Sequence, residues 1–427
     1  MHLTLYKWSP KHVHFQKEKK KSMETSIHFF ITLFFFISAP LPFAMSAPFT
    51  NLSLSFPIFY NSSQPSSIQP QGSVGTSFTY RKALFLSITI GTPPQTQPVL
   101  LDTGSELSWL LHSVSRTSAY NPSLSSSFSY LRCKNHLCKD FDSAVCGQRN
   151  RCGYSFSYAD GTVGEGEIGT EVMALSKNFV INSLVFGVQK ISSDPLRGIL
   201  GLNRGQLSFI SQSKVPKFSY CIPNHGSEGT FYIGTNPNSN SFRYTKLLTS
   251  NDNLPYFDHT AYTLNLHGIR LGKKRLPLER SVFQPDHTGA GQTIIDSGTQ
   301  YSYMTGTIYG ALKTEFMSQN VKYERWIKSG YVHEDVLDLC YEMNGGEVEG
   351  FLKSINHLFL EFGDGVEMKL GGLNLLHEVM SGIWCFTFGN SDYLGSEINI
   401  IGNHHQRNMW VEYDAQNYRL GFAPARC

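Results

Sequence analysis

The feature that most constrains this chain is a short motif that occurs twice. Residues 99–105 read as an apolar run followed by Asp-Thr-Gly-Ser, and residues 293–299, 194 positions later, read as an apolar run followed by Asp-Ser-Gly-Thr. Another pair of similar segments, 198–201 and 399–402, repeats at nearly the same offset. Two ordered matches indicate a duplicated unit, so the sequence predicts two similar lobes with a boundary between about residues 242 and 258.

The rest of the pattern favours mainly β structure. Short apolar or alternating runs are separated by Gly, Asn, Ser and Pro, beginning with a strand at 84–90 that a Gly-Thr-Pro-Pro turn ends. The best helical candidate covers residues 308–320. A chain of 427 residues is long enough for two domains that each bury a core.

Both copies of the motif place an aspartate between an apolar strand and a turn of small residues. Apolar surroundings favour a neutral carboxyl, whereas nearby hydroxyl and backbone N–H groups favour the charged form. If the lobes bring Asp102 and Asp296 together, the two charges repel and the pair shares one proton. The neutral acid can then polarise a peptide carbonyl while the ionised one takes a proton from water. The sequence thus predicts peptide hydrolysis that needs no metal, no cofactor and no covalent nucleophile.

A hairpin is predicted between the two copies. Residues 154–158 alternate aromatic and small polar side chains before an Ala-Asp-Gly turn, and a second strand-like stretch covers 167–175. Tyr158 and Gly161 are then near the tip. Such a hairpin can fold over a cleft and exclude water, although the pattern alone is equally typical of a surface hairpin.

The N-terminus is typical of a targeting signal. Lysines precede an apolar run at 27–39, which is short for a membrane span, and small residues follow near position 46. We expect a signal region at 1–47, or one starting from Met23, with a membrane anchor or buried helix as the alternative. Residues 48–80 are expected to be a short, exposed pro-segment or linker, with regular structure beginning near Ala83. The sequons at Asn51 and Asn61 predict glycosylation in the secretory pathway.

Charge and cysteine content indicate the environment and the partners. A net charge of +3 is too small to indicate nucleic-acid binding. The eight cysteines, all after residue 130, indicate an oxidising compartment. The spacing of the first four lacks the paired C-x2-C pattern of zinc sites, which favours disulfides. The adjacent His404 and His405 are expected to line the cleft or the surface, not to bind a metal.

These motifs together resemble the pepsin-like aspartic proteases, and in particular the plant nepenthesin-like branch, from about Phe85 to Cys427. The resemblance rests on the two aspartate motifs, Trp109, the hairpin with Tyr158, and the Gly-Ile-Leu-Gly and Ile-Ile-Gly-Asn segments. It implies that Asp102 and Asp296 form a catalytic dyad. The supporting residues that it implies are Gly104, Ser105, Gly298, Thr299 and Trp109, with Tyr158 and Gly161 in a flap over the substrate. Residues 285–292 and 403–410 resemble a cell-survival-type subgroup of plant members.

The resemblance also implies an architecture and a set of disulfides. It implies a mainly β, bilobal acid-protease fold, with an N-terminal lobe at 81–245 and a C-terminal lobe at 256–427. The implied bridges are Cys133–Cys152 and Cys138–Cys146, within an insertion at 133–152, together with Cys221–Cys427 and Cys340–Cys385. That branch often has a further bridge from the run at 110–114 to the position of Val188, and this chain lacks both of its cysteines.

Two other functions remain open from the sequence. The same scaffold serves in plants as an inactive inhibitor or lectin-like binding protein, and fold alone does not exclude that role. The presence of both aspartates and their hydroxyl neighbours favours an aspartic endopeptidase. A dimeric viral-type protease is excluded because two unlike copies lie in one chain. We expect a soluble monomer that acts on polypeptides at acid pH in the extracellular space or cell wall, with the vacuole and endoplasmic reticulum as alternatives.

Overall fold

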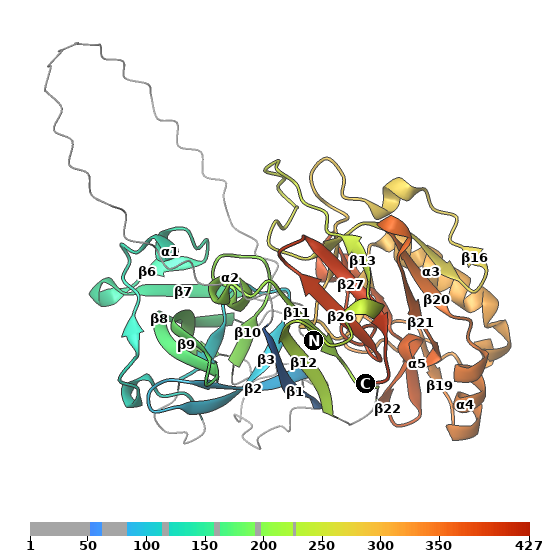
Figure 1. Cartoon of the computed structure of the whole chain (residues 1–427). Helices are drawn as coiled ribbons and strands as arrows, with labels where there is room; N and C mark the ends of the chain where they lie inside the picture. The colour runs from blue at the N-terminus through green and yellow to red at the C-terminus, as the bar shows by residue number, and fades with distance from the viewer. Residues whose placement is uncertain (1–51, 62–82, 113–118, 158–162, 193–197, 225–227) are drawn as a thin grey trace, which may run out of the picture.

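The computed structural model describes residues 52–61, 83–112, 119–157, 163–192, 198–224 and 228–427. The predicted signal region, Asn51, Tyr158 and Gly161 lie outside these ranges. Within them, no helix is long and apolar enough to cross a membrane. Figure 1 shows two lobes, one built mainly from the blue-to-green half of the chain and the other from the orange-to-red half.

A 15-stranded sheet forms the N-terminal lobe and continues into the centre of the molecule. In spatial order its strands are β13 (Arg243–Lys246), β27 (Arg419–Pro424), β26 (Met409–Asp414), β11 (Lys217–Cys221), β12 (Glu228–Gly234), β1 (Ser53–Asn61), β2 (Ala83–Ile90), β3 (Gln95–Asp102), β10 (Gly198–Gly201), β4 (Trp109–Leu111), β9 (Phe179–Ser192), β8 (Val163–Ser176), β7 (Cys152–Ser157) and β6 (Ala144–Cys146), and β5 (Ser129–Tyr130) pairs with β8. The C-terminal strands β26 and β27 lie beside the N-terminal-lobe strand β11 at the centre of Figure 1.

Three smaller sheets and most of the helical structure form the C-terminal lobe. The sheets are β14 (Thr263–Leu264), β17 (Thr293–Ile295), β25 (Asn399–Ile401), β18 (Ser302–Met304) and β24 (Phe388–Asn390); β16 (Lys274–Arg275), β15 (Leu266–Leu271), β20 (Leu358–Phe362) and β21 (Glu367–Leu370); and β19 (Cys340–Glu342), β23 (Ile383–Phe386) and β22 (Leu376–Met380). The α-helices of the two lobes are α1 (His136–Lys139), α2 (Phe209–Ser213), α3 (Gly306–Gln319), α4 (Gly345–Ser354) and α5 (Gly372–Leu375).

Period-two and helical patterns in the sequence account for these elements. Leu84, Leu86 and Ile88 of β2 are buried, as expected for one face of a strand. In α3, Ile308, Leu312 and Phe316 recur every four residues and are fully buried. The predicted strand at 84–90, the helix near 308–320 and the mainly β class are therefore confirmed.

The two copies of the aspartate motif occupy equivalent positions in the two lobes. In the N-terminal lobe β3 runs parallel to β10, and β10 runs antiparallel to β4. In the C-terminal lobe β17 runs parallel to β25, and β25 runs antiparallel to β18. The internal repeat thus corresponds to a repeated three-strand unit in which each aspartate follows the central parallel pair.

The expectation that regular structure begins near Ala83 is wrong. Strand β1 pairs antiparallel with β12, from Ser53 opposite Gly234 to Phe59 opposite Glu228, and then with β2. Ile58 is fully buried, and Leu54 and Phe56 pack against the same core. The segment predicted to be exposed is therefore the strand that joins β12 to β2 in the large sheet.

Two of the four implied disulfides are also wrong. The insertion is closed by Cys133–Cys146 and Cys138–Cys152, whereas the other two bridges, Cys221–Cys427 and Cys340–Cys385, are confirmed. The reason is burial. Cys138 on α1 points inward and meets the fully buried Cys152, while Cys133 and Cys146 pair nearer the surface.

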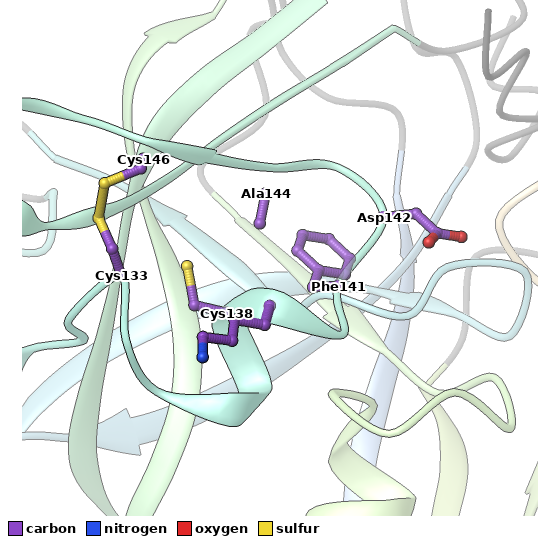
Figure 2. Close-up of a pocket in the computed structure, with 7 residues that line it drawn as sticks. Cys133, Cys138, Phe141, Asp142, Ala144 and Cys146 are labelled. Atoms are coloured by element: carbon purple, nitrogen blue, oxygen red, sulfur yellow. A yellow bond between two sulfur atoms is a disulfide. The ribbon is translucent and has the colours of Figure 1, made fainter. Parts of the chain in front are cut away.

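The insertion also carries a surface pocket. Figure 2 shows the Cys133–Cys146 bridge, Cys138, Phe141 and Asp142 around a cavity of about 360 Å³. It belongs to the insertion and includes neither motif aspartate.

The position of the missing further bridge is visible in the structure. Leu110 of β4 lies opposite Val188 of β9 in a parallel pairing, and both side chains are buried. The backbone N–H of His112 donates to the carbonyl of Gln189 at 2.9 Å. The two segments where that branch has cysteines are therefore adjacent, and apolar packing occupies the place of a covalent link.

Candidate active site

The two aspartate turns meet where the lobes join. Asp102 is the last residue of β3, and Asp296 directly follows β17; both are buried. Thr103 and Ser297, the residues that follow them, form a reciprocal pair of hydrogen bonds. The Thr103 N–H donates to the Ser297 hydroxyl at 3.1 Å, and the Ser297 N–H donates to the Thr103 hydroxyl at 2.9 Å. These bonds fix the spacing of the two turns and hence of the carboxyls.

Each carboxyl receives a backbone donor from its own turn. The N–H of Gly104 donates to Asp102 Oδ1 at 3.0 Å, and the N–H of Gly298 donates to Asp296 Oδ1 at 2.9 Å. Both glycines therefore have the positions that the resemblance implied for them. The turns are built alike, as the repeated sequence predicts.

Hydroxyl groups complete the surroundings of the two acids, but not symmetrically. Thr299 donates to Asp296 Oδ2. Ser105 lies close enough to Asp102 to lower its pKa, although its hydroxyl has no partner within strict hydrogen-bond geometry among the described residues.

Burial and mutual repulsion act on the dyad. Loss of water contact, followed by the nearby charge of Asp296, raises the pKa of Asp102 well above its ordinary value, and the Ser105 hydroxyl and the Gly104 N–H only partly offset these effects. Two carboxyls in contact titrate as a pair that holds one proton. The raised pKa indicates that the pair binds a proton more readily than an ordinary aspartate does.

Two serines that the sequence analysis did not identify support the turns from behind. The Ser108 hydroxyl accepts from the N–H of Gly201 at 3.0 Å, and the Ser302 hydroxyl accepts from the N–H of Gly402 at 3.0 Å. Each serine comes six residues after its aspartate, so the repeat itself contained the signal.

Positions 201 and 402, whose N–H groups donate to these serines, require glycine because another part of the backbone approaches each of them closely. A Cβ on Gly201 would lie 2.5 Å from the Glu106 carbonyl oxygen, and one on Gly402 would lie 2.1 Å from the Tyr301 carbonyl oxygen.

The hairpin predicted to cover the cleft is formed by β7 and β8, paired from Gly153 opposite Glu167 to Ser157 opposite Val163. Trp109 is buried in the same cluster as Phe156 of β7. Its support of Tyr158, and the contact of Tyr158 and Gly161 with substrate, stay predictions because the hairpin tip is outside the described residues.

The expectation that His404 and His405 line the cleft or the surface is wrong. Both are buried in the C-terminal lobe, where His404 packs against Tyr301 and His377, and His405 stacks on Phe388. They lie three and four residues after the end of β25, whose three residues are all buried. No group of three or more metal-ligating side chains occurs within the described ranges.

Comparison with known proteins identifies the family. The family model "Xylanase inhibitor N-terminal" matches residues 85–235, and "Xylanase inhibitor C-terminal" matches residues 261–424. The chain is 38% identical to the aspartic proteinase PCS1 of Arabidopsis thaliana, with 82% of this chain and 83% of that protein covered. It is 32% identical to the aspartic proteinase nepenthesin-1 of Nepenthes gracilis, with 80% and 77% covered.

Solved structures show the same fold at lower identity. A structure named edgp superimposes with a TM-score of 0.67 at 18% identity, covering 87% of this chain and 95% of that one. Basic 7S globulin from soybean superimposes with a TM-score of 0.63 at 16% identity, covering 87% and 96%. The duplicated turns, the buried carboxyl pair and these relatives agree: the chain belongs to the nepenthesin-like branch of the plant pepsin-like aspartic endopeptidases.

Proposed function

We propose that this endopeptidase cleaves polypeptides at acid pH through Asp102 and Asp296. One observation carries the proposal: two buried carboxyls, each held by its own turn, are in contact, and the pKa of one of them is raised. In the free enzyme the pair holds one proton. The protonated carboxyl donates to the carbonyl oxygen of the scissile peptide, and the ionised carboxyl takes a proton from the attacking water.

Acid pH is part of the proposal because the pair must keep its shared proton. As the pH rises, that proton is lost, both carboxyls become charged, and no acid remains to polarise the substrate carbonyl. Burial raises the pKa of Asp102, which extends the active form towards milder acid than an ordinary aspartate would allow.

A binding function on the same scaffold is the alternative, because both matching family models carry the name of a xylanase inhibitor. The intact set of acids and donors in both turns argues against it, since a binding surface needs neither a shared proton nor two equivalent sets of carboxyl donors. The solved relatives, at 16–18% identity, indicate the fold alone.

The site of action is proposed from the sequence. The signal region at 1–47, the sequons at Asn51 and Asn61, and four disulfides are all consistent with the secretory pathway and an extracellular or cell-wall location. Asn61 is the last residue of β1. We further propose that the protein acts as a monomer.

The decisive experiment replaces each dyad member. Asp102→Asn and Asp296→Asn should each lower kcat for cleavage of denatured globin between pH 3 and 6 by roughly a thousandfold or more, because either change removes the acid–base pair. The exposed Asp142→Asn is the matched control and should retain full activity. A parent protein without pepstatin-sensitive cleavage anywhere in that range refutes the enzyme assignment, and residual activity in Asp296→Asn refutes the dyad.

A further inference from the structure

Beneath the dyad lies a set of buried polar side chains whose role the aspartate motif does not explain. Tyr220 of β11, Tyr413 of β26 and Gln406, in the segment between β25 and β26, are all fully buried. The Tyr220 and Tyr413 hydroxyls are 2.7 Å apart, and the Tyr220 hydroxyl also contacts Gln406 Oε1. The charge of Asp296 reaches both phenols and contributes to raising the pKa of each.

The amide of Gln406 determines the direction of these hydrogen bonds. Gln406 Nε2 donates to the backbone carbonyl of Asp296 at 3.1 Å and to that of Ile401 at 2.8 Å. Carbonyl oxygens only accept, so both amide hydrogens are used and Oε1 must face Tyr220 as an acceptor. Tyr220 therefore donates to Gln406, and its oxygen accepts from the hydroxyl of Tyr413.

The chain of donors continues to the first aspartate turn. The Tyr413 hydroxyl also lies near the Thr103 hydroxyl: burial raises the pKa of Tyr413, and the Thr103 hydroxyl, acting as a donor, lowers it. The other acceptor near that hydroxyl, the Ile295 carbonyl, lies at 3.4 Å. The Thr103 hydroxyl in turn accepts from the backbone N–H of Ser297 at 2.9 Å.

These contacts form a closed ring on a single peptide group. The N–H of Ser297 and the carbonyl of Asp296 belong to the same peptide bond, and they point in opposite directions because that bond is trans. The Thr103 hydroxyl binds the N–H of this peptide group, and the Gln406 amide binds its carbonyl. The hydroxyls of Tyr413 and Tyr220 connect these two side chains. We name these four side chains the dyad ring: Thr103, Tyr413, Tyr220 and Gln406.

In the first aspartate turn, a different kind of donor binds the backbone carbonyl of the aspartate. The carbonyl of Asp102 accepts from the backbone N–H of Leu202 at 2.8 Å. In the second turn the N–H of Asn403 instead donates to the carbonyl of Thr299 at 2.7 Å, and a side chain, Gln406, takes over the carbonyl of Asp296. The orientation of the second turn therefore depends on side chains from both lobes.

We infer that Tyr413, Tyr220 and Gln406 are positioning residues, which set the orientation of Asp296 relative to Asp102 and so the geometry of the pair that holds the proton. Their hydrogen bonds reach the backbone carbonyl of Asp296 and one another, so they act on the turn that carries the carboxyl. The inference rests on the proposed function of the dyad. A small change in the orientation of one catalytic group lowers the rate without weakening substrate binding.

The test compares substitutions of similar size in the ring with one outside it. Tyr413→Phe, Tyr220→Phe and Gln406→Met should each lower kcat roughly ten- to hundredfold with little change in KM. Tyr120→Phe is the control, because it also removes a buried phenol hydrogen bond, to Glu171 at 2.8 Å, that does not belong to the ring. It should lower thermal stability and leave kcat unchanged.

Two further variants separate positioning from simple loss of stability. Either single substitution already breaks the ring of hydrogen bonds. The double variant Tyr413→Phe/Gln406→Met should therefore have nearly the same kcat as either single variant. At acid pH the carboxyl introduced by Gln406→Glu is neutral, and it still offers one acceptor and one donor. It should therefore recover much of the kcat that Gln406→Met loses.

Ring variants with kcat within about twofold of the parent, or losses that multiply in the double variant, would overturn the inference. If Tyr413→Phe does not fold, the difference in kcat between Gln406→Glu and Gln406→Met tests the inference. A parent protein that neither cleaves globin nor binds pepstatin overturns the proposed function, and this inference with it. An active parent with unaffected ring variants overturns the inference alone.

Discussion

Thr299 and Ser105 occupy matching positions in the two turns, yet they act on their carboxyls differently. Thr299 donates directly to Asp296, while Ser105 only lowers the pKa of Asp102 from a less favourable geometry. The two carboxyls therefore have different hydroxyl surroundings, although the sequences of their turns repeat.

His405 shows how burial at one residue affects the stability of the whole chain. Burial, followed by the nearby charge of Arg407, lowers the pKa of His405 to about 3. Its ring nitrogens are within hydrogen-bond distance of the hydroxyls of Ser302 at 2.5 Å and Thr387 at 3.0 Å. The unfolded chain therefore binds a proton at this residue below about pH 6.5, and the folded chain does not.

A pH dependence of stability follows from that difference. The contribution of His405 is fully present above about pH 6.5, and it is lost by up to about 1.4 kcal/mol per pH unit as the pH falls towards 3. Urea unfolding of His405→Asn between pH 3.5 and 7 should show a correspondingly smaller slope than the parent. His287→Asn, at an exposed position, should keep the parental slope. Equal slopes in the parent and His405→Asn contradict this assignment.

At this scale the two buried aspartates could be identified from the sequence because their motif is local and occurs twice. The residues of the dyad ring could not. Tyr220 and Gln406 are 186 positions apart, and Tyr220 and Tyr413 are 193 apart, so no local pattern relates them. Their contacts arise only after β11 and β26 pair across the two lobes.

Among the elements, β1 limits where a pro-segment can be cleaved from the chain. It is the strand between β12 and β2, and without it both of those strands would expose an unpaired edge in the large sheet. Removal of a pro-segment at 48–80 would take this strand away. N-terminal sequencing of the purified protein should therefore find a first residue before Leu52, and a start after Asn61 contradicts this expectation.

Packing of β1 can be tested in the folded protein. Ile58 is fully buried opposite Gly229, whose Cβ position lies 2.9 Å from the Ile58 side chain. Ile58→Ala should lower the free energy of unfolding by about 2–4 kcal/mol, measured by urea denaturation. Phe59→Ala, at a position 45% exposed on the other face, should cost less than about 1 kcal/mol. Similar losses in the two variants would show that the strand does not pack as described.

Strand β1 could not be predicted because the alternation of Leu54, Phe56 and Ile58 is short and lies in a region rich in Ser and Pro. Its partner β12 is far away along the chain. The insertion disulfides were mispredicted for a related reason. Both pairings fit the spacing, and only the inward orientation of Cys138 decides between them.

For the whole molecule, the sheet shared between the lobes is the main connection. Strand β26 from the end of the chain pairs with β11, and the Cys221–Cys427 disulfide fastens the same region across 206 positions. The two lobes are therefore joined by both hydrogen bonds and a covalent link. The two-lobed plan itself could be predicted from the repeat, but the pairing of β11 with β26, which belong to neither copy of the motif, could not.

The disulfides should differ in their effect on stability. In the chain-entropy account a bridge that closes about 100 residues contributes about 4.7 kcal/mol, and one that closes about 15 residues contributes about 3 kcal/mol. The Cys221→Ala/Cys427→Ala variant should accordingly lose more free energy of unfolding than Cys133→Ala/Cys146→Ala, which closes only 13 positions. Guanidinium denaturation of the two variants makes the comparison, and an equal or reversed order would contradict it.

The dyad ring also has a consequence for biosynthesis. Gln406 lies 110 positions after Asp296, and Tyr413 follows it, so both aspartates leave the ribosome well before the side chains that orient them. A growing chain therefore carries both acids but lacks their alignment. If the ring orients Asp296 as inferred, the alignment of the two acids is completed only after the chain has been translated past Tyr413.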